Sequence, residues 1–578
     1  MGTKLYKNGY PVLGYWGKQL GWHRRPDLPN SKQPSIETIV QTPRLEVQRL
    51  GFAPSSRYEV LGPAFAYLDL FVTEGRLRAS IDFGFKTEVC ELELGSQMRL
   101  YPNSHLCIEP ISNTAQMFVA RVAEFETRTE LNPSRFYQDL NTDWSLISSP
   151  ATMNLSALSD LASSVIANSI DSLSPKFMNQ LYSGVIPHAI IADNIRSQTK
   201  TTLAIQEASP VFSQIEVALT EAICQLIGWS CGTSDGISVP GGTFGNFMAL
   251  HCARIRKWPE GKSKGFFGKP ARIYVSSEAH YSFKKGALAL GFGIDNIVEI
   301  ATDEHGKMIV SQLAATIAND KRSGFVPLLV GATAGTTVQG AFDPLEEIAR
   351  LCQSEGIWFH VDAAWGCPAL FSKKLKHLVV GIEAADSVTF DAHKFFASSL
   401  TATLFLTKHK SLLLEANDVA GGDYLFHNNT PESDRGRLTW QCGRGPDLLA
   451  FWLLWKHLGL QGLSEVVDHF LVIQQECVKW IQTQQRLKLM HQPEYLNLCV
   501  EVLHPQMKTD NEWSAKVRRV LKAKNQAFVN YSTNSEGVTF LRLILVHPHI
   551  SVQNILDILN DALSVTVDDV NKNSLAAT

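Results

Sequence analysis

Between about residues 200 and 410, short apolar runs alternate with amphipathic stretches. The amphipathic stretches, such as "DPLEEIARLCQSEG", have the periodicity of a helix with one buried face. Alternation of strands and helices predicts a mostly parallel sheet that is covered by helices on both faces. The apolar runs that we expect to form strands are "ARIYVSS", "FVPLLVGATAG", "GIWFHVDAAWG", "ADSVTFDAHK" and "ATLFLTK".

The pattern differs on either side of this region. Residues 1–125 show short alternating runs separated by "GP", "EGR" and "GF", which indicates strands and hairpins. After residue 420 come a polar, glycine-rich stretch, the helical "PDLLAFWLLWKHLG", and a final strand and helix in "GVTFLRLILVHPHISVQNILDILNDAL". The predicted domains are a β-rich extension (1–125), a helical arm or linker (126–205), a large domain (206–460) and a small C-terminal α+β domain (461–578).

Composition narrows the class of protein only a little. The chain has 578 residues, of which 45% are hydrophobic and 19% charged, and its net charge is −3. This near-neutral balance does not favour binding to nucleic acid or to an anionic membrane surface. We expect no membrane span, no secretory signal and no metal site. The ten cysteines form no CxxC pair and lack zinc-finger spacing, which is typical of reduced thiols in a cytoplasmic protein.

Polar residues follow the predicted strands one after another. Ligands of open α/β sheets bind beyond the carboxyl ends of the strands, so these residues are candidates for a common site. Each of them alone would be an ordinary polar residue at a strand end, but their succession indicates a site. They are Glu278 and His280, Thr336 and Thr337, Asp362, and His393 and Lys394.

A glycine-rich turn precedes an amphipathic helix in "SVPGGTFGNFMALHCARIRK". Gly241 and Gly242 allow the backbone to approach an anion, and the helix start offers free N–H groups and a favourable dipole. Thr243 adds a hydroxyl donor. The spacing differs from GxxxxGK[ST], so we expect a phosphate group here and not a nucleoside triphosphate.

Together these groups indicate pyridoxal 5'-phosphate as the cofactor. Lys394 would form a Schiff base with the cofactor aldehyde, which explains an amine at the end of a buried strand. Asp362 would pair with the pyridinium nitrogen and keep it protonated. His280 would stack on the ring, and Gly242 and Thr243 would hold the phosphate.

The region from about 174 to 560, two thirds of the chain, resembles the group II pyridoxal-phosphate-dependent amino acid decarboxylases. It is most similar to the branch that acts on glutamate, cysteine sulfinate and aspartate. The resemblance implies the fold type I architecture of aspartate aminotransferase. The matching segments are "SPKFMNQLYSG", "VPGGTFGN", "SEAHYSFKKGA", "GATAGTTVQGAFDPLEEIA", "WFHVDAAWG", "ADSVTFDAHK", "DYLF", "QCGR" and "TFLRLILVHP".

The resemblance also implies further roles around the cofactor and the substrate. Thr337 would bond near the phenolic oxygen, Ala364 would pack against the ring, and His393 would neighbour the Schiff-base lysine. The residues implied to act on the substrate are Gln180 in its pocket, Arg542 on a carboxylate and Tyr424, on a mobile loop, as the proton donor to the carbanion carbon. Without the family, Arg542 and Tyr424 would be interpreted as ordinary surface residues.

Three features depart from the family pattern. Asp391 stands where an asparagine is usual, and a carboxylate would repel a nearby phosphate unless it were turned away or protonated. "SDRGRL" (433–438) replaces "YDTGDK" after "YLF", so this loop is expected to close differently. "QCGR" is followed by "GPDLLAF", which lacks a lysine that is often found there.

The predicted function is α-decarboxylation of an acidic L-amino acid by a homodimer with its active site at the subunit interface. "QLYSG" resembles the "LFSG" of cysteine sulfinate and aspartate enzymes, which favours these two substrates over glutamate. The alternatives are another pyridoxal-phosphate reaction, such as carbon–carbon lyase chemistry or decarboxylative oxidation, and an inactive scaffold. Residues 1–125 would be a stabilising extension or, alternatively, a domain that binds a regulator.

Overall fold

The computed structural model divides the chain into two compact units, residues 1–171 and 172–578, and each is described by itself. The residues described are the backbone of ten strands between 22 and 123, and then 161, 164–230, 232–266, 268–422, 424–427, 433–506 and 508–576. The finer domain limits at 125, 205 and 460 stay a prediction.

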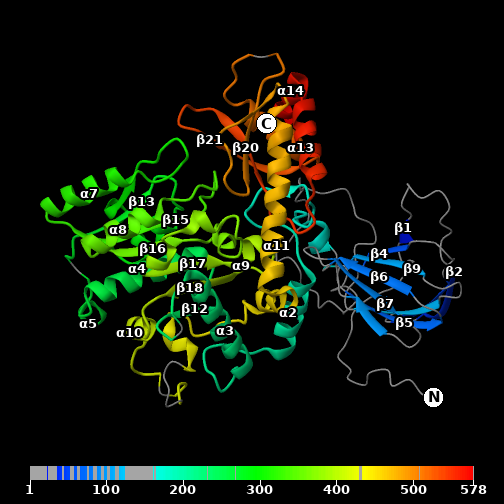
Figure 1. The fold of residues 1–578 in the computed structure, drawn as a ribbon, viewed down its shortest axis with the longest axis horizontal. Coiled ribbons are helices and arrows are strands. Elements are labelled where there is room, and N and C mark those ends of the chain that lie inside the picture. The colour runs from blue at the N-terminus through cyan, green and yellow to red at the C-terminus, as the bar shows by residue number, and fades with distance from the viewer. Residues whose placement is uncertain are drawn as a thin grey trace, which may run out of the picture. The chain divides into compact units, whose positions relative to one another are not determined.

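The described strands of the first unit form two five-stranded antiparallel sheets (Figure 1). The β-rich character predicted for 1–125 is therefore present in its described backbone. One sheet has the order β1 (Trp22–His23), β4 (Tyr58–Leu61), β9 (His105–Pro110), β6 (Leu77–Asp82), β7 (Thr87–Leu92). The other has the order β2 (Ser35–Gln41), β3 (Leu45–Gly51), β10 (Gln116–Ala123), β5 (Ala66–Glu74), β8 (Gln97–Leu100).

The second unit is built on a seven-stranded sheet. Strands β14, β13, β15, β16 and β17 run parallel, while β18 is antiparallel to both of its neighbours. The predicted mostly parallel sheet is thus confirmed. Its order is β12 (Asp235–Pro240), β18 (Ala402–Thr407), β17 (Ser387–Asp391), β16 (Trp358–Asp362), β15 (Val326–Thr333), β13 (Ala271–Ser276), β14 (Ile297–Ile300).

Helices connect and cover these strands, as Figure 1 shows for α4, α7 and α8. The parallel strands are almost wholly buried, as expected of a sheet covered on both faces. The helices are α2 (Pro187–Thr199), α3 (Pro210–Ile227), α4 (Gly242–Lys257), α5 (Gly261–Lys264), α6 (Ser282–Ala289), α7 (Val310–Arg322), α8 (Leu345–Glu355), α9 (Ala392–Phe395) and α10 (Leu412–Asn417). The 3₁₀ turns are η1 (Ile294–Asn296), η2 (Cys367–Leu370), η3 (Lys376–Val379), η4 (Ile382–Ala384) and η6 (Arg435–Leu438).

A smaller C-terminal part follows the long helix α11 (Leu449–Gln482), which is interrupted at Gly459, where φ is 66°. The φ of Gly459 lies in the left-handed region that glycine adopts without strain. The sheet here has the order β11 (Phe177–Met178), β21 (Phe528–Thr533), β22 (Thr539–Ile544), β20 (Asn497–Val502), β19 (Leu487–Leu489). The helices are α12 (Trp513–Ala523), α13 (Val552–Ser564) and α14 (Val567–Ala576).

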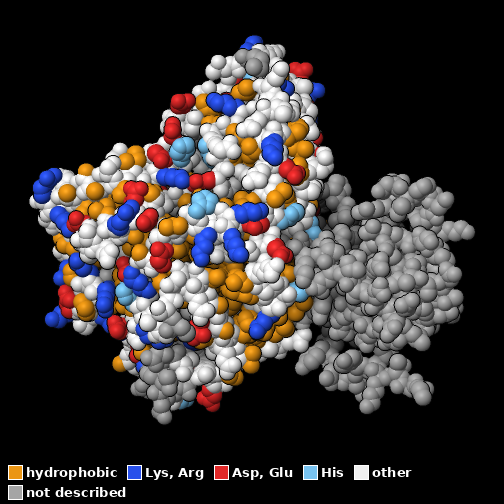
Figure 2. Space-filling view, viewed as in Figure 1, with side chains coloured by type: hydrophobic (Ala, Val, Ile, Leu, Met, Phe, Trp, Pro, Cys, Tyr) orange, Lys and Arg blue, Asp and Glu red, His pale blue; other side chains and the backbone are white. Residues whose placement is uncertain are grey.

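On the face drawn in Figure 2, basic and acidic side chains are interspersed, in keeping with the net charge of −3. No helix within the described residues is long and apolar enough to cross a membrane. The cysteines whose side chains are described all carry free thiols: Cys224, Cys252, Cys352, Cys367, Cys442, Cys477 and Cys499.

A buried ion cluster joins α3 to the segment around η6. Glu216, on α3, is 1% exposed and accepts hydrogen bonds from Arg435, at 2.9 Å, and from Arg444. Burial alone would raise the pKa of Glu216, but Arg444 and Arg435 lower it to about 2. Arg435 belongs to the 433–438 segment that departs from the family pattern, so this segment is anchored in the core.

We expect Glu216→Gln to destabilise the protein by about 3–5 kcal/mol, because two buried guanidinium groups would lose their counter-charge. The wild-type carboxylate contributes stability above its ordinary pKa of 4.5, and this contribution is lost as the pH falls towards 2. Urea unfolding at neutral and acidic pH should therefore show the largest difference between the proteins at neutral pH.

The matched control is Glu221→Gln, an exposed position on the same helix, which should change the free energy of unfolding by less than about 0.5 kcal/mol. Equal stability of Glu216→Gln and Glu221→Gln would contradict the assignment.

Candidate functional site

A cavity of about 390 Å³ lies at the carboxyl edge of the parallel strands. It brings together most of the predicted site residues, but not Tyr424, Glu278 or Thr336. The residues in its lining include Gln180, Gly242, Thr243, His280, Thr337, Asp362, Ala364, His393, Lys394 and Arg542. Glu278 and Thr336, which also follow strands, are not part of that lining; the Thr336 hydroxyl instead accepts a hydrogen bond from Ala341 N–H at 3.0 Å.

The glycine-rich turn places the start of α4 in the lining of this cavity. Gly241 has a φ of 93°, a conformation that glycine adopts far more readily than other residues. A Cβ atom on Gly242 would lie 2.8 Å from Asp391 Oδ2 and 3.2 Å from the Ala364 Cβ, so no side chain fits there. The first N–H groups of α4 have no partner within the helix and can bind an anion.

Asp362 ends β16, and both oxygens of its buried carboxylate accept a hydrogen bond. Its Oδ2 accepts from Asn246 Nδ2 at 2.7 Å, and its Oδ1 accepts from Ala364 N–H at 3.1 Å. A buried carboxylate without such donors would be energetically costly. Asp362 is therefore held as a fixed acceptor at the edge of the cavity.

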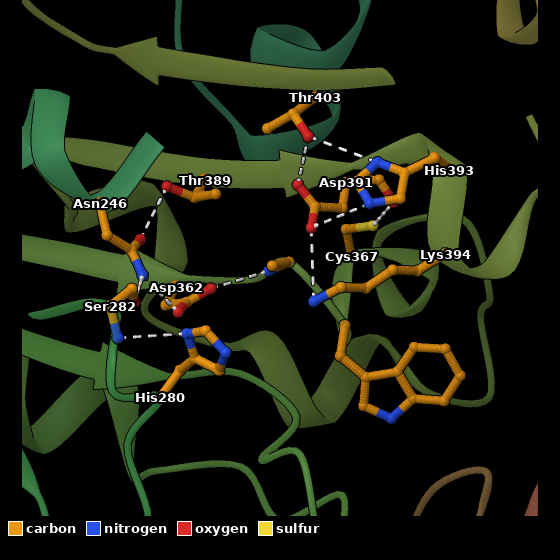
Figure 3. Close-up of polar contacts among 12 residues, drawn as sticks. Asn246, His280, Ser282, Asp362, Cys367, Thr389, Asp391, His393, Lys394 and Thr403 are labelled. Carbon is orange, nitrogen blue, oxygen red and sulfur yellow. Dashed lines mark hydrogen bonds and ion pairs between the residues drawn. The ribbon is translucent and has the colours of Figure 1, made fainter. Parts of the chain in front are cut away.

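Asn246 is itself oriented by a second set of buried side chains (Figure 3). Its Oδ1 accepts from Thr389 Oγ1 at 3.0 Å and from His360 Nε2 at 3.0 Å. Burial lowers the pKa of His360 to about 4, so the ring is neutral. Donation to the Asn246 oxygen requires the proton on Nε2, and Nδ1 then accepts from the Ser387 hydroxyl at 2.9 Å. This network turns the amide of Asn246 so that its N–H group points at Asp362.

Two further imidazoles border the cavity in the neutral form. Burial lowers the pKa of His280 and of His393 below the ordinary value. The Nδ1 atom of His280 accepts from Ser282 N–H at 3.3 Å, and Nδ1 of His393 lies 3.2 Å from the Ala402 carbonyl, to which it donates. A neutral ring such as that of His280 can stack on a flat aromatic group.

Lys394 lies on the short helix α9 and lines the cavity, and its side chain is 20% exposed. Its Nζ atom is 3.3 Å from Asp391 Oδ2. Asp391 also accepts from the Thr403 hydroxyl at 2.6 Å (Figure 3). The ion pair removes the unfavourable burial of a lone ammonium.

Arg542 enters the cavity from β22 of the C-terminal sheet. Its Nη1 and Nη2 donate to the carbonyls of Thr337 and Asn179 at 3.0 and 2.8 Å, while Nε has no partner among the described residues. Two of the five guanidinium N–H groups are used in this way and the Nε–H group is buried, so one further N–H group on each of Nη1 and Nη2 can bind a ligand. Gln180 is exposed at the same cavity.

Tyr424 lies outside this cavity and is 81% exposed. It belongs to a turn in which Leu425 N–H and Phe426 N–H both donate to the Gly422 carbonyl at 2.9 Å. Within one chain, therefore, the phenol does not reach Lys394.

The chemistry of these donors fits pyridoxal phosphate. The cavity offers an amine, a fixed carboxylate, a neutral imidazole and the open start of a helix, which suit an aldehyde, a pyridinium nitrogen, a ring face and a phosphate. The fold and the site together define a pyridoxal-phosphate-dependent enzyme.

Comparison with known proteins identifies the family. Residues 147–502 match the pyridoxal-dependent decarboxylase conserved domain. The chain is 38% identical to the acidic amino acid decarboxylase GADL1 of Bos taurus over 420 residues, which cover 70% of this chain and 80% of that protein. It is 36% identical to the cysteine sulfinic acid decarboxylase of Mus musculus over 420 residues, 70% of this chain and 85% of that one.

Among solved structures, the apo form of mouse CSAD superimposes with a TM-score of 0.69 at 32% identity, covering 72% of this chain and 89% of that chain. The chain belongs to the family of pyridoxal-dependent decarboxylases. It is a pyridoxal-phosphate-dependent amino acid decarboxylase, as its motifs predicted.

The residues that orient Asp362 were not predicted from the sequence. Asn246 lies within the quoted motif "VPGGTFGN", four positions after Gly242, and His360 lies two positions before Asp362. A polar side chain on the buried face of a helix or in a buried strand is the available signal, since buried polar groups require partners.

We expect Asn246→Asp to weaken cofactor binding by about 10- to 150-fold, since a hydrogen bond to a charged group contributes about 1.5–3 kcal/mol. The substitution removes the donor to Asp362 and places a second carboxylate beside it. Titration of the apoprotein with pyridoxal phosphate, followed by absorbance, measures the change.

Ser282→Ala serves as control, because Ser282 Oγ accepts from the same Asn246 amide at 2.8 Å without touching Asp362. Its cofactor affinity should remain near the wild-type value. An Asn246→Asp protein that binds the cofactor as the wild type does would refute the role of this network.

Proposed function

We propose that this protein catalyses the α-decarboxylation of an acidic L-amino acid, with aspartate or cysteine sulfinate favoured and glutamate as the alternative. The products would be β-alanine, hypotaurine or 4-aminobutyrate. The observation that carries the proposal is the meeting of Lys394, Asp362 and Arg542 in one cavity. The names of the relatives, acidic amino acid decarboxylase and cysteine sulfinic acid decarboxylase, support the acidic substrate class.

Each residue has a distinct task in this proposal. Lys394 holds the cofactor, Asp362 keeps the pyridine nitrogen protonated, and the start of α4 with Gly242 and Thr243 binds the phosphate. His280 and Ala364 fix the ring plane, and Thr337 and His393 line the cofactor site. The bound cofactor supplies an electron sink for the bond to the α-carboxylate.

Substrate recognition falls to Arg542 and Gln180. A buried guanidinium with N–H groups to spare suits a carboxylate or sulfinate in a bidentate arrangement. Because Arg542 is tied to two backbone carbonyls, its position is fixed before the substrate arrives. This fixed cation favours an acidic side chain over an apolar one.

The proposal includes a homodimer whose partner completes the site. Leu400 lines the cavity and yet is 53% exposed, and Val419 and Trp440 are 73% and 42% exposed. Exposed apolar side chains of this kind suit an interface. Tyr424, which does not reach the cavity of its own chain, would enter the partner's cavity on its glycine-containing turn and return a proton to the substrate carbon. A cytoplasmic location stays a prediction.

Substrate preference can be tested directly. The purified holoenzyme should release carbon dioxide and the matching amine from aspartate or cysteine sulfinate faster than from glutamate. Lys394→Ala should abolish release, whereas Lys373→Ala, at an exposed lysine, should retain it. Bound cofactor without carbon dioxide release, or formation of an aldehyde, would favour another pyridoxal-phosphate reaction, and failure to bind the cofactor would favour a scaffold.

The placement of Tyr424 calls for a complementation experiment. Tyr424→Phe alone should lower turnover by about a hundredfold or more, as expected for a lost proton donor. Mixing Lys394→Ala with Tyr424→Phe subunits should restore about one quarter of wild-type activity, because half of the dimers then contain one intact site. A mixture that remains inactive, with dimers present, would show that Tyr424 does not serve the partner's site.

A further inference from the structure

Asp391, the last residue of β17, is a buried carboxylate that the decarboxylation chemistry does not require. It is 1% exposed. Its Oδ1 accepts from Thr403 Oγ1 at 2.6 Å, and its Oδ2 lies 3.3 Å from Lys394 Nζ (Figure 3). The carboxylate is thus held in one orientation by a hydroxyl from β18 and an amine from α9.

This orientation points the carboxylate at the anion-binding end of α4. A Cβ atom on Gly242 would lie 2.8 Å from Asp391 Oδ2 and 3.2 Å from Oδ1. The N–H groups that would bind the phosphate are therefore next to a negative charge. The carboxylate is not turned away from this site.

The titratable groups around Asp391 supply little positive charge to offset its carboxylate. Nε2 of His393 lies 3.8 Å from Asp391 Oδ2, but burial lowers the pKa of His393, and that of His280, so both are neutral near pH 7. Burial raises the pKa of the Cys367 thiol well above its usual range, so it adds no charge. Of these groups, the nitrogen of Lys394 supplies the one cation, assisted by the partial positive charge of the helix start.

We propose that Asp391 discriminates against the dianionic form of the cofactor phosphate. The protein then binds pyridoxal phosphate less tightly than it would without this carboxylate, and the phosphate takes up a proton on binding. A phosphate monoester loses its second proton near pH 6, so the repulsion grows above that pH. The inference concerns the cofactor and does not depend on which amino acid is the substrate.

The test compares Asp391→Asn with the wild type, using pyridoxal phosphate and phosphate-free pyridoxal as two probes of the apoprotein. Asparagine has the same shape and can still accept from Thr403. At about pH 8 we expect the substitution to increase the affinity for pyridoxal phosphate about tenfold or more and to leave the affinity for pyridoxal nearly unchanged. The gain should shrink at about pH 6.

Asp386→Asn is the matched control, because Asp386 precedes the same strand at its opposite end, where it pairs with Lys408 and His409. Asp386→Asn should change neither the affinity for pyridoxal phosphate nor the affinity for pyridoxal. If Asp391→Asn increases the affinities for pyridoxal phosphate and pyridoxal equally, the carboxylate acts through Lys394 and the proposal fails. It also fails if pyridoxal phosphate binds no better.

The wild type alone gives a second measurement should the variant fold poorly. The ratio of its affinities for pyridoxal phosphate and pyridoxal should rise as the pH falls from about 8 to about 6. Taking the ratio cancels the effect of pH on the amine of Lys394. A ratio that stays constant or falls would overturn the proposal.

Discussion

The amide of Asn246 is the contact on which the site depends. It joins α4 to β16 and β17, because one end donates to Asp362 and the other accepts from His360 and Thr389. In the proposed function, the same helix would bind the phosphate at its N-terminus, so one element would position both ends of the cofactor. A buried carboxylate needs hydrogen-bond donors, and here the sheet and the helix fix them together.

Five of the seven strands in the sheet of the large domain could be predicted because their apolar runs are continuous, whereas β12 and the four-residue β14 were not predicted. The parallel arrangement then places His280, Asp362 and Lys394 at one edge, so most of the proposed cofactor site follows from the order of the strands. Arg542 comes from β22, far along the chain, and only the resemblance to a family indicated its position. The place of Tyr424 could not be derived, because it is set by a turn and, as we propose, by a second chain.

The segment 433–438 illustrates how a departure from a family pattern is accommodated. Arg435 enters the core to pair with Glu216, and Arg437 forms two hydrogen bonds with Asp418 at 2.9 and 2.6 Å. These contacts anchor the end of the loop that follows Tyr424. Arg435 and Arg437 are therefore held in place, since moving Arg435 would separate it from the buried carboxylate of Glu216.

Arg542 connects three stretches of chain that are distant in sequence: its own strand, the turn at Thr337 and the segment at Asn179. In the proposed function, the residue that would recognise the acidic side chain is therefore also a structural anchor. Exchanging this arginine to accept a neutral amino acid would remove two hydrogen bonds to the backbone. The bonds that would fix the preference for acidic ligands are thus the same ones that link the C-terminal sheet to the turn at Thr337 and the segment at Asn179.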